Sequence, residues 1–327
     1  MADPKPKIYI TRRIPQAAVD MLSAACEVRQ WDHDDPVPRA ELLANVGDID
    51  ALYSLLTEKV DAELLDRAPR LRVVSQMAVG YDNIDIAACT ARGIPVGHTP
   101  EVLTETTADL TWALMMAAAR RLVEAAAAVK GGQWTTWKPM WMTGPDVYGA
   151  TLGIFGLGRI GVAMARRAMG FNMRVLYHDA FESPHAAAVN ARFVDLPTLL
   201  AESDYLTLHC PLTPETRGMV NEGFLRQMKP TAILVNTARG PVVDEQALYR
   251  ALSEGWIHAA GLDVTQVEPL PLASPLLTLP NCLILPHIGS ASIPTRTRMA
   301  TLAAENLLAG LAGQPLVYAV NAAALGG

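Results

Sequence analysis

The chain has 327 residues, of which 50% are hydrophobic, 18% are charged and 6% are aromatic, and its formal net charge is −6. This composition is typical of a globular protein and excludes an intrinsically disordered one, and the length suits two domains of ordinary size. The negative net charge disfavours binding to the phosphate backbone of nucleic acids.

The sequence contains no recognisable segment that would direct the chain into a membrane or a secretory pathway. Its N-terminus lacks an apolar signal core. The uncharged run at 110–119 is about half as long as a membrane helix, which needs roughly 20 residues. The cysteines form neither a CxxC pair nor a cluster with histidines, so we expect reduced thiols and no metal site (Cys26, Cys89, Cys210 and Cys282). We therefore expect a cytoplasmic protein that binds neither membranes nor nucleic acid.

Short apolar runs alternate with helical patterns over the first hundred residues. Apolar residues recur at helical spacing in 15–25, which predicts a helix there. Strands that alternate with helices favour a parallel sheet with helices on its faces. The strands that we expect in this part of the chain lie at 7–11, 51–56, 71–74 and 94–96.

The longest helical pattern in the sequence covers 103–129. Thr104 can cap its N-terminus, and Glu105 lies in the first turn, where a carboxylate interacts favourably with the helix dipole. A loop rich in glycine and tryptophan follows at 131–149. Its tryptophans either cover an edge of the core or form an interface arm, because tryptophan is enriched at interfaces (Trp134, Trp137 and Trp141).

The alternation of strands and helices begins again at residue 151 and predicts a second sheet. A final helix is expected at 296–311, and we expect it to pack back onto the first domain. We therefore predict two doubly wound α/β domains, one at 101–286 and the other made of 1–100 and 287–327. The strands that we expect in the second domain lie at 152–155, 174–178, 205–209, 232–236, 259–263 and 283–286.

A glycine-rich turn with the pattern GxGxxG connects the first of these strands to an amphipathic helix. Gly156 permits a tight turn, Gly158 lets the backbone approach a pyrophosphate, and Gly161 lets the helix lie close to the strand. The N-terminus of the helix offers N–H groups and the positive end of its dipole to the anion. A glycine-rich turn without a ligand is the alternative, but the strand, the spacing and the helix together predict a dinucleotide-binding loop.

Asp179 ends the next expected strand, 18 residues after Gly161. A carboxylate at this position accepts hydrogen bonds from the hydroxyls of the adenosine ribose and would repel a 2′-phosphate. The alternatives are a structural aspartate in a turn and a cationic neighbour, His178, that would tolerate the phosphate. We expect NAD as the cofactor, with NADP as the alternative.

Three polar residues follow three consecutive expected strands of the second domain, where α/β enzymes place their sites (Arg239, Glu268 and His287). An arginine can hold a carboxylate through two parallel hydrogen bonds. A histidine paired with a glutamate can act as a general acid near neutral pH. Each residue alone has a structural explanation, but together they are the groups that the reduction of a ketone beside a carboxylate requires.

At these motifs the chain resembles the D-isomer-specific 2-hydroxyacid dehydrogenases, and within that family the glyoxylate and hydroxypyruvate reductases. The resemblance covers about 48–315. It implies a Rossmann nucleotide domain inserted into a flavodoxin-like substrate domain, and reduction of a small 2-oxo acid to the D-2-hydroxy acid by hydride transfer. The segments that carry it are VGYDNID at 79–85, VLTETTADL at 102–110, WTTWKPMW at 134–141, GLGRIG at 156–161, NTARG at 236–240, GLDV at 261–264 and LPHIGS at 285–290.

The resemblance also implies roles for individual residues. It implies that Arg239 binds the substrate carboxylate, that His287 is the acid/base and that Glu268 is its partner. The other residues implied around the substrate are the backbone N–H groups of Val79 and Gly80, with Leu55 and Ser290 at the border of the pocket. The residues implied around the cofactor are Leu157, Gly158, Arg159 and Ile160 at the pyrophosphate, Asp179 at the ribose, and Pro211, Thr237, Asp263, Thr107 and Gly289 along the rest of the dinucleotide.

The resemblance further implies a homodimer that uses the long helix and the following loop, with Trp141 reaching the partner's active site. The chain departs from related NADPH-dependent reductases, which often have arginine or serine in place of Asp179, and from phosphite dehydrogenases, which have lysine in place of Val79. Two other functions share this fold. An NAD-sensing corepressor would need a disordered tail and a phosphoglycerate dehydrogenase a regulatory domain, and we expect neither segment here.

Overall fold

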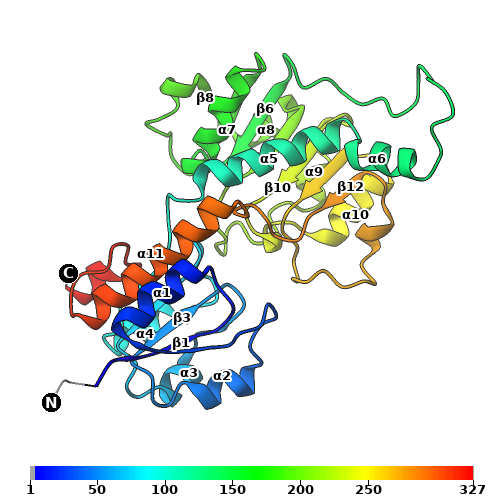
Figure 1. Ribbon diagram of the computed structural model, residues 1–327. Helices are drawn as coiled ribbons and strands as arrows, with labels where there is room; N and C mark the ends of the chain where they lie inside the picture. Colours follow the sequence, from blue (N-terminus) through cyan, green and yellow to red (C-terminus); the bar gives the residue numbers. More distant parts are fainter. Residues whose placement is uncertain (1–3, 327) are drawn as a thin grey trace. The chain divides into compact units, whose positions relative to one another are not determined.

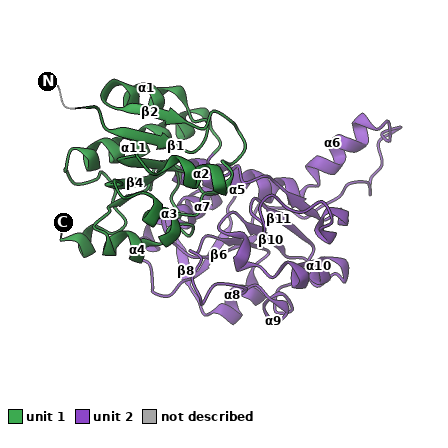
Figure 2. Cartoon of the chain, turned by 90° about the horizontal axis from the view of Figure 1, so that it is seen from below, with its two compact units in different colours: residues 1–103, 291–327 green, residues 104–290 purple. Residues whose placement is uncertain are grey.

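The computed structural model describes residues 4–326. The chain divides into two compact units, one made of residues 1–103 and 291–327 and the other of Thr104–Ser290 (Figure 2). The boundaries lie three and four residues after those expected at 100 and 286. As a result, His287 and Ser290 belong to the same unit as Arg239 and Glu268.

The first unit contains a five-stranded parallel sheet in the order β2-β1-β3-β4-β5, which is the flavodoxin-like order. Strand β2 was not among the expected strands. The strands are β1 (Lys7–Ile10), β2 (Glu27–Gln30), β3 (Ala51–Ser54), β4 (Val73–Gln76) and β5 (Val96–Gly97). The helices are α1 (Gln16–Ala25), α2 (Arg39–Asn45), α3 (Ala62–Arg67), α4 (Ile86–Ala91) and α11 (Ile293–Leu311), and a 3-10 turn spans Ala322–Leu325.

Both faces of this sheet are buried, as expected for a parallel sheet. Ile8 and Ile10 face one hydrophobic cluster, and Tyr9 between them faces the other. Helices α1 and α11 cover the first of these faces, which confirms that the last long helix packs onto the first unit (Figure 1). Helix α11 begins three residues earlier than expected because the hydroxyl of Ser292 caps it, accepting a hydrogen bond of 3.3 Å from the Thr295 N–H.

The second unit contains a seven-stranded parallel sheet in the order β12-β11-β10-β9-β6-β7-β8. Six of the strands follow the Rossmann order, and β12 extends the sheet at one edge. The two parallel α/β sheets confirm the predicted fold class, although β8 was not expected. The strands are β6 (Thr151–Phe155), β7 (Arg174–His178), β8 (Ala191–Phe193), β9 (Tyr205–Leu208), β10 (Ile233–Asn236), β11 (Ala259–Leu262) and β12 (Cys282–Ile284).

Helices cover both faces of the second sheet. Helices α5 and α7 contribute to one buried cluster, and α8, α9 and α10 contribute to the other. No helix in the described part of the chain is both long and apolar enough to cross a membrane. The helices are α5 (Thr104–Ala119), α6 (Leu122–Lys130), α7 (Arg159–Met169), α8 (Leu196–Glu202), α9 (Glu222–Leu225) and α10 (Glu245–Ser253), with 3-10 turns at Ala187–Val189, Gly240–Val242 and Pro275–Thr278.

The prediction of one uninterrupted helix over 103–129 is wrong. The helix breaks after Ala119 because Arg121 adopts a left-handed conformation with φ of +53°. The chain that returns from the loop passes directly over the end of α5, where a Cβ on Gly144 would lie 2.0 Å from the Ala119 carbonyl oxygen. The break therefore lies where two segments that are distant in the sequence meet, and an alanine-rich helical pattern does not encode that meeting.

Helix α6 and the loop that follows it extend away from the sheet of the second unit in both views (Figures 1 and 2). Most of the large apolar side chains in this arm are exposed, and Trp137 has 79% of its surface accessible. Trp141 is half-buried, with the Lys138 ammonium 5.2 Å from the centre of its ring. The exposed members of the arm are Leu122, Val123, Val129, Trp134, Trp137 and Met140.

Candidate active site

The glycine-rich turn after β6 has the geometry that close packing requires. Gly156 has φ of +95°, and a Cβ there would lie 2.9 Å from the His209 carbonyl carbon. A Cβ on Gly161 would lie 2.3 Å from the Gly156 carbonyl oxygen. At Gly158, in contrast, nothing lies within 4 Å of the position of a Cβ. Two of the three glycines are therefore needed by the fold of the turn, and the third faces open space.

Helix α7 begins directly after this open position. Gly158 is its N-cap residue and provides no side-chain hydrogen bond, and Arg159 and Ile160 form the first turn. The first N–H groups of a helix have no partner within the helix, and the helix dipole is positive there. Open space above Gly158 and an N-terminus without a side-chain cap together fit the pyrophosphate of a dinucleotide.

Asp179 lies at the end of β7 and is tied to the same turn. One of its carboxylate oxygens accepts a hydrogen bond of 2.8 Å from the Leu157 N–H, and the other accepts one of 2.8 Å from the Ala180 N–H. Leu157 thus donates its N–H to Asp179, and its side chain is buried. Each carboxylate oxygen has a second lone pair, so Asp179 can still accept from a ribose hydroxyl. His178 beside it is bound through Nδ1 to the Val194 carbonyl oxygen at 2.9 Å.

The three residues of the predicted trio follow β10, β11 and β12, which are neighbours in the sheet. Because these strands are parallel, their carboxyl ends lie at one edge. The loop after β10 runs against the loop after β11, since a Cβ on Gly240 would lie 1.8 Å from the Thr265 carbonyl oxygen. Glycine at this position therefore lets the backbone beside Arg239 approach the segment that leads to Glu268.

Glu268 and His287 are in direct contact, with 2.7 Å between Oε2 and Nδ1. The other carboxylate oxygen accepts a hydrogen bond of 3.1 Å from the Thr265 N–H. Burial by itself raises the pKa of Glu268. The opposing effects are together larger and bring the pKa below its usual value: the hydrogen bond from His287, the charges of His287 and Arg239, and the hydrogen bond from the Thr265 N–H. The ionised carboxylate accepts only, so Nδ1 carries the proton and Nε2 is the nitrogen left for a substrate.

The loop that carries His287 is held by Asp263. His287 has φ of +55°, which is rare for a residue other than glycine, and its N–H donates to the Asp263 carbonyl oxygen at 2.9 Å. The buried carboxylate of Asp263 accepts from the N–H groups of Ile288 at 2.8 Å and Gly289 at 2.7 Å. Burial raises the pKa of Asp263 despite these hydrogen bonds, which lower it. Asp263 thus fixes the backbone on both sides of the imidazole.

The remaining predicted cofactor residues lie along the same edge of the sheet. Thr107 on α5 and Thr237 after β10 are buried. Thr111 links the two, because its hydroxyl donates to the Thr107 carbonyl oxygen at 2.7 Å and lies 2.7 Å from the Thr237 hydroxyl. Pro211 is exposed after β9, and Ser290, which was predicted at the border of the substrate pocket, is half-buried after the His287 loop. The edge therefore combines the glycine-rich turn, the trio and these hydroxyl groups in one unit.

His209 is a residue of this edge that the sequence analysis missed. It follows β9 directly, and its backbone lies against Gly156. Both ring nitrogens are buried without a hydrogen-bond partner among the described residues. Burial lowers the pKa of His209 to about 3, so the ring is neutral at physiological pH. Its position one residue after an apolar strand, before Cys210 and Pro211, was the available signal.

The predicted substrate residues of the first unit follow β3 and β4. The Leu55 N–H donates to Oε2 of the buried Glu58 at 2.7 Å. The carbonyl oxygens of Val79 and Gly80 contact the His98 imidazole at 2.9 Å and the Gln76 amide at 2.6 Å. These residues lie at the carboxyl edge of their own sheet, and Leu55, which fell inside the strand expected at 51–56, follows β3 instead.

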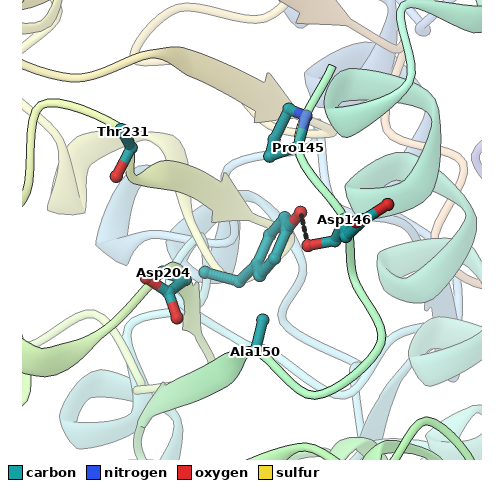
Figure 3. Close-up of a pocket in the computed structure, with 6 residues that line it drawn as sticks. Pro145, Asp146, Ala150, Asp204 and Thr231 are labelled. Atoms are coloured by element: carbon teal, nitrogen blue, oxygen red, sulfur yellow. Dashed lines mark hydrogen bonds between the residues drawn. The ribbon is translucent and has the colours of Figure 1, made fainter. Parts of the chain in front are cut away.

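A pocket of about 170 Å³ lies at the opposite edge of the second sheet (Figure 3). It opens beside the amino ends of β6, β9 and β10, next to Ala150, Asp204 and Thr231. Two of its polar side chains already have partners, because the Tyr205 hydroxyl donates to the Asp146 carbonyl oxygen at 3.0 Å and Asp204 pairs with Lys229 at 2.8 Å. Among the described residues, no cluster of His, Cys, Asp and Glu is arranged to hold a metal ion.

Comparison with known proteins places this geometry in a family. The family model described as D-isomer specific 2-hydroxyacid dehydrogenase, NAD binding domain, matches residues 112–289. A glyoxylate reductase of Korarchaeum cryptofilum is 53% identical over 312 residues, which are 95% of this chain and 94% of that protein.

Solved structures give the same result. The crystal structure of the TT0316 protein of Thermus thermophilus matches with a TM-score of 0.91 and 47% identity, covering 96% of this chain and 99% of that chain. An NADPH-dependent glyoxylate/hydroxypyruvate reductase of Sinorhizobium meliloti, solved in complex with NADP and malonate, matches with a TM-score of 0.83 and 32% identity over 97% of each chain.

Proposed function

The chain belongs to the D-isomer-specific 2-hydroxyacid dehydrogenases, and we propose that it reduces glyoxylate or hydroxypyruvate to the corresponding 2-hydroxy acid with a nicotinamide cofactor. The observation that carries this proposal is the 2.7 Å contact between His287 and Glu268, with the charge of Arg239 close enough to lower the pKa of Glu268. The glycine-rich turn of the same unit fits the pyrophosphate of the cofactor.

Each member of the trio has a distinct part in the reaction. When bound, the nicotinamide supplies the hydride. Arg239 holds the substrate carboxylate through its guanidinium group, which is planar and always charged. His287 donates a proton from Nε2 to the carbonyl oxygen of the substrate, and Glu268 stabilises the imidazolium and keeps Nδ1 protonated. The backbone N–H groups of Val79 and Gly80 give the carboxylate further donors, and Leu55, Ser290 and Trp141 border the substrate.

We propose NAD rather than NADP as the preferred cofactor. Asp179 lies beside the glycine-rich turn with its negative charge, and a 2′-phosphate placed near it would be repelled. Glu182, three residues later, adds a second carboxylate to this segment. A relative from Sinorhizobium meliloti was solved with NADP, so the fold by itself does not exclude that dinucleotide.

The other parts of the proposal concern assembly and location. We propose a homodimer in which the exposed apolar side chains of α6 and the following loop are covered by the second subunit, with Trp141 reaching the partner's active site. All four cysteines are free thiols, which fits a reducing compartment, and we propose the cytoplasm.

The test is a set of four steady-state assays that combine glyoxylate or hydroxypyruvate with NADH or NADPH. We expect the absorbance of the reduced cofactor to fall with at least one 2-oxo acid, and kcat/KM to be higher with NADH than with NADPH. Constant absorbance in all four assays would disprove the proposed activity. A higher kcat/KM with NADPH would disprove only the cofactor assignment.

A further inference from the structure

We propose that Gln76 and His98 are positioning residues that turn the backbone N–H groups of the segment Val79–Tyr81 toward the carboxylate of the substrate. The inference rests on the proposed function, because it takes this segment as part of the substrate site. It goes further in naming the side chains that give the backbone its donor orientation.

The first observation is that three consecutive carbonyl oxygens of this segment are held by donors of the first unit. The Ala78 oxygen accepts a hydrogen bond of 2.8 Å from the Thr99 N–H. The Val79 carbonyl oxygen lies 2.9 Å from Nδ1 of His98, and the Gly80 carbonyl oxygen accepts a hydrogen bond of 2.6 Å from Nε2 of Gln76. A carbonyl oxygen cannot donate, so His98 carries a proton on Nδ1 in this contact.

The second observation concerns the N–H groups of the same peptide units. In a trans peptide the N–H points opposite to the C=O. Each held carbonyl therefore turns the N–H group of its own peptide unit, that of Val79, Gly80 or Tyr81, away from the donor that holds it. None of these three groups donates to a protein acceptor in the described part of the chain. Successive N–H groups on one side of a backbone segment form a concave site for an anion.

The third observation is that the amide of Gln76 is itself fixed. Gln76 is fully buried at the end of β4. Its Oε1 accepts a hydrogen bond of 2.9 Å from Nδ2 of Asn83, which leaves Nε2 to face the Gly80 oxygen. The same Asn83 nitrogen also contacts the carbonyl oxygens of Leu55 at 3.0 Å and Glu58 at 2.6 Å. Asn83 thus joins the loop after β3 to the loop after β4 and sets the orientation of the glutamine.

The decisive variants replace Gln76 by residues of similar shape that lack the donor. Gln76→Met removes the hydrogen bond to the Gly80 oxygen, and Gln76→Glu places an acceptor in front of it. We expect KM for the 2-oxo acid to rise about tenfold, the effect of roughly one lost hydrogen bond. We expect kcat and KM for NADH to change by less than about twofold, because the trio and the glycine-rich turn belong to the other unit. A uniform loss of kcat without a change of KM would overturn the inference.

A matched control separates positioning from loss of stability. Val74 is fully buried on the same strand and contributes only packing through its side chain. We expect Val74→Ala to lower the midpoint of thermal unfolding and to leave KM for the 2-oxo acid unchanged. A rise of KM in Val74→Ala equal to that in Gln76→Met would show that the effect is a general consequence of destabilisation.

Binding of oxalate gives a measurement that does not depend on turnover. Calorimetric titration of the whole protein in the presence of NADH should give weaker oxalate binding in Gln76→Met than in the unaltered protein and in Val74→Ala. Equal affinities in all three, or no binding by the unaltered protein, would overturn the inference. A third outcome separates the two proposals. If the unaltered protein shows no turnover but binds oxalate, and only Gln76→Met binds it more weakly, the proposed activity would be disproved and the positioning role would stand.

Discussion

His287 combines a left-handed backbone with a side chain that faces a carboxylate. A residue other than glycine in such a conformation costs on the order of 1–3 kcal/mol, and it persists only where the surroundings determine it. Here the surroundings are the three hydrogen bonds that Asp263 accepts from residues 287–289. The imidazole is therefore placed by its own backbone as well as by Glu268.

Replacing His287 by alanine tests its role as the proton donor. We expect His287→Ala to lower kcat by about 10²–10⁴-fold, the usual contribution of a positioned general acid. The affinity for NADH, measured from the quenching of protein fluorescence, should change little, because the glycine-rich turn is unaltered. His258 is exposed before β11, and His258→Ala serves as the control with unchanged kinetics. Equal turnover in His287→Ala and the unaltered protein would refute the assignment.

The loops after β10 and β11 form a single element of the site through their contact at Gly240. The nearest atoms to a Cβ there are the carbonyl oxygen and carbon of Thr265 at 1.8 and 2.0 Å and the Gln266 nitrogen at 2.6 Å. All three are backbone atoms, so no change of side-chain rotamer can make room. The distance between Arg239 and the Glu268 loop therefore depends on the absence of one methyl group.

Gly240→Ala should separate these two loops. We expect kcat/KM for the 2-oxo acid to fall about 10²-fold, the loss that a displacement near 1 Å can cause. The free energy of unfolding should decrease by about 1–3 kcal/mol through overpacking. Gly170→Ala is a matched control, because the nearest atom to its Cβ would lie at an ordinary 3.5 Å. Kinetics in Gly240→Ala that match those of Gly170→Ala would contradict the role of this contact.

The strands and their ends could be predicted from the sequence because apolar runs mark buried parallel strands. The predicted strand at 174–178 agrees with β7, and the expected strands before Arg239 and Glu268 end within one residue of β10 and β11. The edge strands β2 and β8 were missed because their exposed residues, such as Glu27 and Arg192, hide the pattern. The break between α5 and α6 was missed because it coincides with the close approach of Gly144, which is distant in the sequence, to Ala119.

The proximity of Glu268 and His287 could also be predicted, since complementary side chains at the ends of neighbouring strands have few other arrangements. The roles of Gln76, His98 and Asp263 could not. Their partners are backbone groups of other segments, which no motif of residue types describes. The groups proposed to meet the substrate could therefore be found from the sequence, whereas the groups proposed to orient the backbone around it could not.

At the scale of the whole molecule, the exposed apolar arm predicts a second subunit. We expect the unaltered protein to have the mass of a dimer by light scattering after gel filtration. The double variant Val123→Glu with Trp137→Glu should have the mass of a monomer, because it places charges in the proposed apolar interface. Leu272 is 95% exposed outside the arm, and Leu272→Glu should remain dimeric. A monomeric unaltered protein, or a dimeric double variant, would contradict this assembly.

Helix α11 has a consequence for biosynthesis. It closes one face of the first sheet, whose strands all lie within the first hundred residues, yet it occupies 293–311. On the ribosome, the nascent first unit therefore leaves the exit tunnel with the face that holds Ile8, Ile10 and Tyr53 covered by α1 alone, because α11 is translated nearly two hundred codons later. The second unit is continuous and can complete its own core first. The part of the chain that is translated earliest is thus the last to mature.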